Sequence, residues 1–177
     1  MDKNRVMNGL FNRGAQNGLF VGLYLTLLSW VLILAIDSSL MNIVALLMLV
    51  CIPLGCFIML RRSYIQENCT TPLSGLWLEG IVTFLCGSMI YALVAYCYLR
   101  WGNPSFIPEQ VSQAIEVYEK IDDDQAREIV SVLQQIEKHK AYPTAQQIVT
   151  QFGLLITFVG SILSLLTASF LKFQRKR

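Results

Sequence analysis

The chain has 177 residues, of which 54% are hydrophobic and 15% are charged, and its formal net charge is +2. Soluble domains carry about 25% charged residues, so this composition excludes an ordinary soluble globular protein. It predicts a chain that is largely embedded in a lipid bilayer.

Four stretches without a charged residue divide the chain, and they run from Gly14 to Ile36, Ser39 to Leu60, Gly80 to Leu99 and Ala141 to Leu171. Each supplies about 20 mostly apolar residues, enough for a helix to cross the roughly 30 Å hydrocarbon layer. We predict an all-α fold, a four-helix transmembrane bundle with spans at about 17–36, 39–60 and 76–99 and a fourth span with a basic tail in 148–177. Residues 100–147 then form an extramembrane segment.

The first span follows Lys3, Arg5 and Arg13, as the apolar core of a secretory signal follows its basic start. The apolar run from Leu19 to Ile36 is longer than such a core and lacks a small-residue cleavage site, so we expect an uncleaved signal-anchor helix. The short Asp37-Ser38-Ser39 connection makes the first two spans a tight antiparallel hairpin.

The distribution of basic residues predicts the orientation. With four spans, nine Lys and Arg residues share one side with both termini, whereas five are spread over the long loop of the other side. Positive residues near span ends favour the cytoplasm. We therefore expect a multi-pass protein of the cytoplasmic (inner) membrane, with both termini cytoplasmic and residues 100–147 extracytoplasmic.

Two spans carry small residues on one helix face. In the first span these are Gly14, Gly18, Gly22 and Thr26, and in the fourth they are Gly160, Ser164 and Ala168. Residues four apart lie on the same side of a helix, and small side chains there let a second helix approach closely. These faces predict two close helix contacts, either within the bundle or between protomers, and we favour the bundle.

Two further residues within the spans stand out. Pro53 removes a backbone donor and crowds the carbonyl of Leu49, which predicts a kink in the second span. Glu79 is an acid near the inner boundary of the third span, and carboxylates at such positions are candidates for proton coupling. We favour an interfacial ion pair of Glu79 with Arg61, Arg62 or Arg13 over that role.

The sequence favours no metal site and no cofactor. Five cysteines, Cys51, Cys56, Cys69, Cys86 and Cys97, are scattered without a CxxC pair, and the only histidine is His139. This pattern is typical of apolar packing residues and argues against a disulfide framework or tetrahedral zinc. No phosphate-binding glycine loop or serine elbow is present, so we expect no enzyme activity. Basic residues lie at span ends, beside lipid headgroups, and do not indicate nucleic-acid binding.

The long loop between the third and fourth spans predicts a helix pair. Val111, Ile115, Tyr118 and Ile121 recur at helical spacing from a start at Pro108. Asp122 with Gln125 resembles a capping box, which opens a second helix with an apolar stripe of Ala126, Ile129, Val130, Leu133 and Ile136. Thr144 and Gln147 form the same pattern before the fourth span. The apolar faces of the pair can cover the span ends or bind a partner.

The chain resembles a family of small bacterial four-span membrane proteins of unknown function. The resemblance rests on the tight first hairpin, on Tyr98-Leu99-Arg100-Trp101 followed by Asn103-Pro104, and on the helical segment before the last span. It implies an integral inner-membrane location and transfers no catalytic residue.

The function that we predict from the sequence is a non-enzymatic structural or accessory module of the lipid bilayer. Its expected partners are a second copy of the chain or other membrane subunits. One alternative is a small transporter or channel subunit that uses Glu79 and the bend at Pro53. Another is a sensor or scaffold whose outer helices recruit an envelope protein.

Overall fold

The computed structural model describes residues 3–35, 39–67, 71–121 and 123–175. Within these residues the chain forms six α-helices and one π-helical turn, without a β-strand, and the predicted all-α fold is confirmed. Four of the helices are long and apolar enough to cross a membrane. Asp37 and Ser38 of the first hairpin, Cys69, and Asp122 of the predicted capping box lie outside the described residues.

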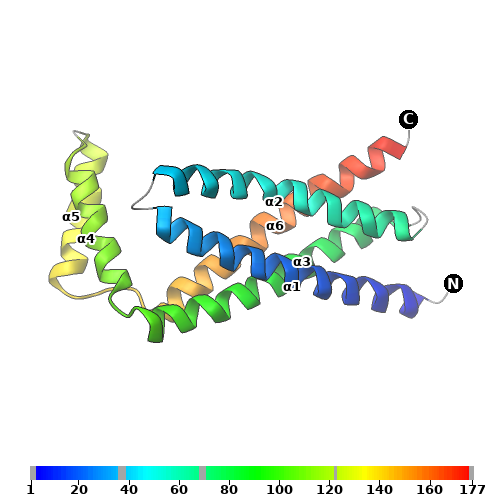
Figure 1. Cartoon of the computed structure of the whole chain (residues 1–177), viewed down its shortest axis with the longest axis horizontal. Helices are drawn as coiled ribbons and strands as arrows, with labels where there is room; N and C mark the ends of the chain where they lie inside the picture. Colours follow the sequence, from blue (N-terminus) through cyan, green and yellow to red (C-terminus); the bar gives the residue numbers. More distant parts are fainter. Residues whose placement is uncertain (1–2, 36–38, 68–70, 122, 176–177) are drawn as a thin grey trace. The chain divides into compact units, whose positions relative to one another are not determined.

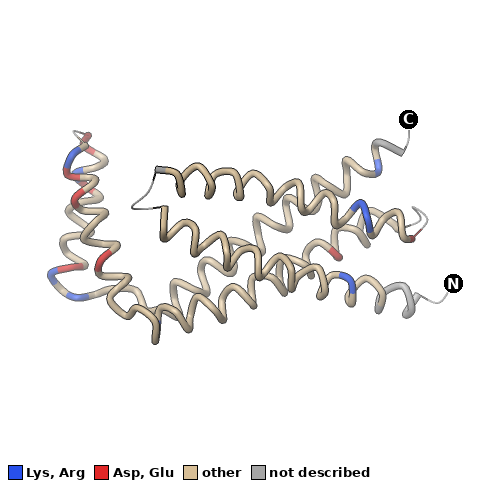
Figure 2. The backbone as a smooth tube through the Cα atoms, viewed as in Figure 1, with Lys and Arg blue, Asp and Glu red and all other residues tan. Residues whose placement is uncertain are grey.

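The four long helices are α1 (Lys3–Ala35), α2 (Ser39–Gln66), α3 (Leu73–Cys97) and α6 (Ala145–Arg175). Apart from the last turns of α3 and the first turns of α6, they belong to one compact unit, the bundle. The start of α1, the end of α2, the start of α3 and the end of α6 meet at one end of it (Figure 1). Figure 2 shows that the charged residues of the bundle gather near this end, and that long uncharged stretches follow. This separation is the one that a bilayer requires.

Side-chain contacts define the neighbours of each helix in the bundle. Tyr24 of α1 donates a hydrogen bond of 2.6 Å to the carbonyl of Met48 in α2. The rings of Phe57 in α2 and Phe170 in α6 meet edge to face, 6.0 Å apart. Trp77 Nε1 of α3 donates to the carbonyl of Ser161 in α6 at 3.2 Å. The core of the bundle is made by residues of α2, α3 and α6, which are Cys56, Leu60, Tyr64, Leu76, Phe84, Ala168 and Leu171.

A second compact unit runs from Val94 to Thr150. It holds the π-helical turn (Tyr98–Gly102), α4 (Phe106–Glu119) and α5 (Asp124–Lys138). The predicted two-helix hairpin between the third and fourth apolar helices is therefore present. Ile115 and Ala126 are its buried side chains.

Two details of this hairpin differ from the sequence prediction. Helix α4 begins at Phe106 and not at Pro108, which falls in its first turn, where the missing N–H of proline removes no helical hydrogen bond. Within the predicted stripe of α5, Ile129 is exposed, while Val130, Leu133 and Ile136 are half-buried. The stripe is thus only partly covered by α4.

The ends of the helices around residue 140 show two standard caps. Ala141 N–H donates to the Ile136 carbonyl at 2.9 Å and Lys140 N–H to the Glu137 carbonyl at 3.1 Å, the pattern of a Schellman motif. Lys140 has a positive φ of 50°, a conformation that glycine usually adopts. Thr144 and Gln147 exchange hydrogen bonds of 2.9 Å and 3.3 Å between side chain and backbone, which is the predicted capping box before α6.

Candidate functional site

Among the side chains that the structure describes, Glu79 is the most buried charged one; it is 1% exposed and lies in the second turn of α3. Ser63, at the end of α2, donates a hydrogen bond to Glu79 Oε1. The second carboxylate oxygen, Oε2, is buried and has no hydrogen-bond partner among the described residues. An ionised carboxylate has about four acceptor positions, so this group retains capacity for a donor.

Arg13 of α1 supplies the nearest positive charge. Its Nε atom lies 3.8 Å from Glu79 Oε1, and its Nη2 atom donates to Glu67 Oε1 at 2.7 Å. The side chain of Arg13 is 24% exposed and that of Glu67 is 15% exposed. The four residues Arg13, Ser63, Glu67 and Glu79, which we call the Glu79 cluster, thus join α1, α2 and α3.

One of the three arginines that we predicted as partners of Glu79, Arg13, lies next to it. Arg61 and Arg62 are exposed, and among the described residues Glu79 contacts Ser63 and Arg13. Helix α1 begins at Lys3, well before the apolar run, so Arg13 is part of the helix. It lies one turn before Asn17, on the side that meets α3. Of the three arginines that the sequence offered, the structure selects the one on α1.

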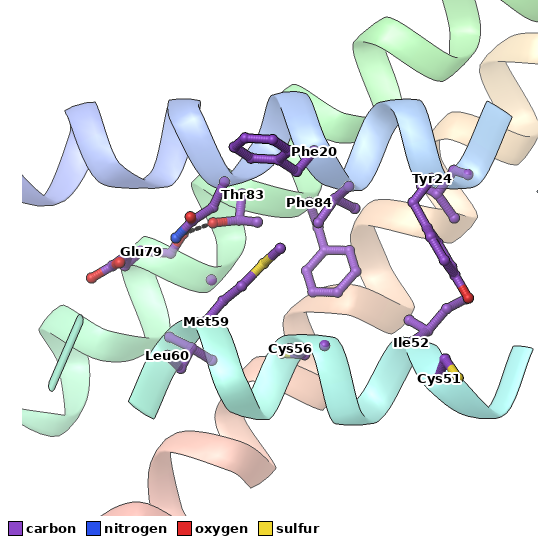
Figure 3. Close-up of a pocket in the computed structure, with 15 residues that line it drawn as sticks. Phe20, Tyr24, Cys51, Ile52, Cys56, Met59, Leu60, Glu79, Thr83 and Phe84 are labelled. Atoms are coloured by element: carbon purple, nitrogen blue, oxygen red, sulfur yellow. Dashed lines mark hydrogen bonds between the residues drawn. The ribbon is translucent and has the colours of Figure 1, made fainter. Parts of the chain in front are cut away.

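A cavity of about 310 Å³ adjoins the Glu79 cluster. Residues of α1, α2 and α3 line it, and the lining is almost entirely apolar apart from Asn17, Glu79 and Thr83. Figure 3 shows Glu79 at one end of the labelled residues, and Tyr24 and Cys51 at the other. A cavity of this size is at the lower end of the range of small-molecule sites.

Gly55 contributes to the cavity by the absence of a side chain. A Cβ atom built on Gly55 would meet no atom within 4 Å. Pro53 lies on the same turn of α2 as Gly55. The helix runs unbroken from Ser39 to Gln66, and the kink at Pro53 stays a prediction. Tyr24 donates to the Met48 carbonyl, next to the carbonyl of Leu49 that loses its donor at Pro53.

The small-residue face of α1 lies against α3. A Cβ built on Gly18 would lie 2.6 Å from Cys86 Cβ and 2.8 Å from the Thr83 carbonyl oxygen. One on Gly14 would lie 3.1 Å from the Glu79 carbonyl oxygen, and one on Gly22 would lie 2.9 Å from that of Gly87. Thr26 donates to the Gly22 carbonyl within its own helix at 2.8 Å. Three glycines at four-residue spacing therefore bring the two backbones together.

The small-residue face of α6 lies against α3 and α2. A Cβ built on Gly160 would overlap the ring of Phe84, and one on Gly80 of α3 would overlap the side chain of Ser164. Ser164 donates to the Gly160 carbonyl at 2.7 Å and lies 3.9 Å from Cys56 Sγ. Ala168 is fully buried in the core. Both small-residue faces are thus in contact within one chain.

The sequence prediction missed the partner face on α3. Glu79, Thr83 and Gly87 recur at four-residue spacing and present their carbonyls to the glycines of α1, while Gly80, Phe84 and Ser88 meet α6. The signal was present in the sequence as Thr83 and Gly87, four residues apart. The pattern was overlooked because it begins at Glu79, and small-residue faces of membrane helices usually consist of uncharged residues.

The described residues hold no group of three or more His, Cys, Asp or Glu side chains that could bind a metal ion. Cys51, Cys56, Cys86 and Cys97 are free thiols. On the hairpin, Glu116 lies 2.9 Å from Lys120, whose hydrogen bond and positive charge lower the pKa of the Glu116 carboxyl. This pair is fully exposed and belongs to an ordinary helix surface.

A protein-family model matches residues 16–172, and its description reads "Protein of unknown function (DUF4199)". The match includes most of each of the four apolar helices, and the whole hairpin. No curated protein and no solved structure matches the chain.

Proposed function

The chain belongs to this family of proteins of unknown function, DUF4199, and from its geometry we propose that it is a non-enzymatic structural or accessory module of a bacterial inner membrane. The observation that carries the proposal is that the polar and small side chains of the bundle form contacts between its helices. Ser88 lies 3.0 Å from Thr157 across α3 and α6, and the Glu79 cluster ties α1, α2 and α3 together. These groups join helix to helix, as structural contacts in membrane bundles do.

The bundle also limits where a partner can bind. Both small-residue faces are covered within the chain, so a partner helix has to pack on another surface. In the most apolar stretch of α2, 17% is buried inside the bundle. The corresponding share is 28% in each of the other three membrane helices. We propose that a membrane subunit packs on its outer side, where the exposed residues are Leu40, Ile43, Leu47, Val50 and Leu54.

The proposed orientation places both termini in the cytoplasm. It is supported by Arg13, Arg61, Arg62 and Lys172, which belong to helix ends that meet at one end of the bundle. A reporter enzyme that is active only after export should remain inactive when it is fused after Arg177 and become active when inserted between α4 and α5. The reverse pattern would overturn the orientation.

Photocrosslinking in native membranes tests the accessory role. A photoreactive amino acid at Leu47 on α2 should give one crosslinked protein band of defined mass, whereas the same group at Phe158 on α6, which is equally exposed, should give only lipid adducts. Positions Val117 and Val132 on the hairpin test an envelope partner in the same way. Lipid adducts at all four positions would refute a protein partner.

A small transporter or channel subunit is the second candidate, and the cavity beside Glu79 is the observation that favours it. In transporters, interrupted helices frame a site within the membrane, and α2 carries Pro53 beside this cavity. Purified protein in vesicles distinguishes the two functions. A solute flux that disappears in Glu79→Gln would support transport, and a tight vesicle would support the accessory role.

A further inference from the structure

We propose that the hairpin of α4 and α5 lies on the membrane surface, with one apolar face among the lipid headgroups on the side where α3 ends and α6 begins. The lipid that suits it carries no net charge, as a zwitterionic phospholipid does. This inference goes beyond the accessory role and does not depend on it. Three features of the unit Val94–Thr150 carry it: the side chains on one face of the hairpin, its attachment to two membrane helices, and its charge.

Two hydrogen bonds between the helices define the polar face of the hairpin. Ser112 Oγ of α4 donates to Glu137 Oε1 of α5 at 2.9 Å, and Gln134 Nε2 of α5 donates to Glu119 Oε1 of α4 at 3.1 Å. Both bridges connect exposed side chains, so these four residues lie together on one water-facing side of the hairpin.

The opposite face of the hairpin is apolar. Val117 and Ile121 of α4 are 57% and 47% exposed, and Ile129 and Val132 of α5 are 40% and 51% exposed. Since each helical residue turns by about 100°, every one of them points about 110° or more away from the mean direction of the bridging residues of its helix. We call these four side chains the apolar face.

The apolar face is continuous across the two helices. The bridges show the register of the antiparallel pair, in which Val117 lies level with Val132, five residues from the first bridge on either helix. Ile121 and Ile129 follow about one turn further along. Exposed apolar side chains that gather in this way mark a surface that binds lipid or protein.

The attachment of the hairpin places a bilayer within its reach. The third apolar helix extends to Gly102, and only three residues separate it from the start of α4 at Phe106, a distance of at most about 14 Å. The ring of Phe106 also packs edge to face on that of Tyr98 in the π-helical turn, with centroids 5.9 Å apart. The fourth apolar helix begins at Ala145, six residues after α5. The hairpin is therefore held where two membrane helices leave the lipid.

Aromatic side chains mark the membrane boundary at this point. Trp101 is 72% exposed, and its ring meets that of Tyr96 edge to face at 6.3 Å. Tryptophan and tyrosine are enriched at the level of the headgroups, where the ring is in an apolar layer and its polar atom reaches water. The bilayer interface thus already passes through this compact unit, and the apolar face extends it. A protein partner would have to be recruited, whereas lipid is always present beside this attachment.

The charge of the hairpin selects the lipid. Between Phe106 and Lys140 the chain carries eight acidic and four basic residues, a net charge of −4. Helices that bind anionic lipid carry an excess of lysine and arginine, and this excess provides part of their affinity. Here the excess is acidic, so anionic lipid repels the hairpin and burial of the apolar face has to provide the attraction.

The experiment uses the full chain in phosphatidylcholine vesicles, with a small fluorescent amino acid incorporated at one position at a time. Val117 and Val132 report on the apolar face. Their neighbours Glu116 and Ser131 are exposed, lie outside that face, and serve as controls. Bromine atoms on the lipid acyl chains quench a probe in the membrane, and iodide quenches a probe in water.

We expect brominated lipid to quench the probes at Val117 and Val132 about threefold more strongly than the two controls, and iodide to quench them in the reverse order. Equal iodide quenching at all four positions would overturn the proposal, because the whole hairpin would then stand in water. Weak quenching of Val117 and Val132 by both agents would also overturn it, since protein would then cover the apolar face.

Val132→Asp and Ser131→Asp form a matched pair of variants. Both add one carboxylate at an exposed position of α5, but only Val132 belongs to the apolar face. With the probe at Val117, Val132→Asp should lower the bromine quenching by about half or more, because a charged group resists transfer out of water, and Ser131→Asp should change it by less than about a fifth. Equal effects of the two substitutions would refute the assignment of the face.

Vesicles in which half of the lipid is phosphatidylglycerol test the preference for uncharged lipid. At low salt the bromine quenching at Val117 and Val132 should fall about twofold, and about 0.5 M salt should restore it, because salt screens the repulsion. Unchanged or stronger quenching in the anionic vesicles would refute this preference.

Discussion

The contact between α1 and α3 yields the sharpest prediction, the effect of adding one methyl group at Gly18. In Gly18→Ala, the new Cβ would lie 2.6 Å from Cys86 Cβ and 2.8 Å from the carbonyl oxygen of Thr83. Non-bonded carbon atoms prefer about 3.5 to 4.0 Å, so the two helices have to separate by about 1 Å. A carbonyl oxygen of the backbone cannot rotate away as a flexible side chain can.

The magnitude follows from two opposing effects. Overpacking in a well-packed interior costs about 1 to 3 kcal/mol, and a gap of about 1 Å at the neighbouring contacts of Gly14 and Gly22 forfeits part of their dispersion energy. In the opposite direction, alanine has a higher helix propensity than glycine, which stabilises the folded state by up to about 1 kcal/mol. We expect Gly18→Ala to lower the free energy of unfolding by about 1 to 2 kcal/mol.

Equilibrium unfolding in mixed micelles, followed by circular dichroism, measures this change. The control is Gly153→Ala, whose methyl group would meet no atom within 4 Å and which should leave stability unchanged or raise it by up to about 1 kcal/mol. If both variants shift the unfolding curve equally, the close approach of α1 and α3 at Gly18 does not exist in the folded protein.

Three further substitutions test other contacts. Arg13→Met should destabilise the bundle by about 2 to 3 kcal/mol, because it leaves Glu79 buried without its nearby cation, and adding Glu79→Gln should restore part of the loss in the same unfolding assay. If the double variant recovers no stability, Arg13 does not stabilise the fold through Glu79. Tyr24→Phe should cost about 1 kcal/mol by removing the hydrogen bond to the Met48 carbonyl, and an unchanged curve would contradict that bond. Lys140→Gly should stabilise the end of α5 by about 1 kcal/mol, since Lys140 has a positive φ, and slower amide hydrogen exchange there is the measurement; faster exchange would exclude strain at this cap.

The sequence was sufficient for those features that depend on local pattern. The apolar runs predicted the four long helices, because a helix must be about 20 residues long to cross a bilayer. The pairing of Thr144 with Gln147 predicted a cap that the structure shows, since both partners lie within one helical turn. Such features require no knowledge of which helix packs on which.

Features that depend on neighbours could not be predicted in the same way. Arg13, Arg61 and Arg62 are equivalent in the sequence as partners of Glu79, and the rotation of α1 about its axis decides among them. The Schellman motif at Lys140 lacks the glycine that usually marks it. The cavity has no sequence signal at all, because it results from a missing side chain at Gly55 together with the placement of three helices.

The contacts of α2 indicate which part of this helix bends most easily. Its polar contacts with α1 and α3 are made on either side of the cavity, at Met48 by Tyr24 and at Ser63 by Glu79. Between these two contacts lie Pro53, which removes a backbone hydrogen bond, and Gly55, which removes a side chain. A helix bends most easily where its own hydrogen bonds are interrupted, so the middle of α2 is the segment that we expect to deform first, between two ends that are held by hydrogen bonds.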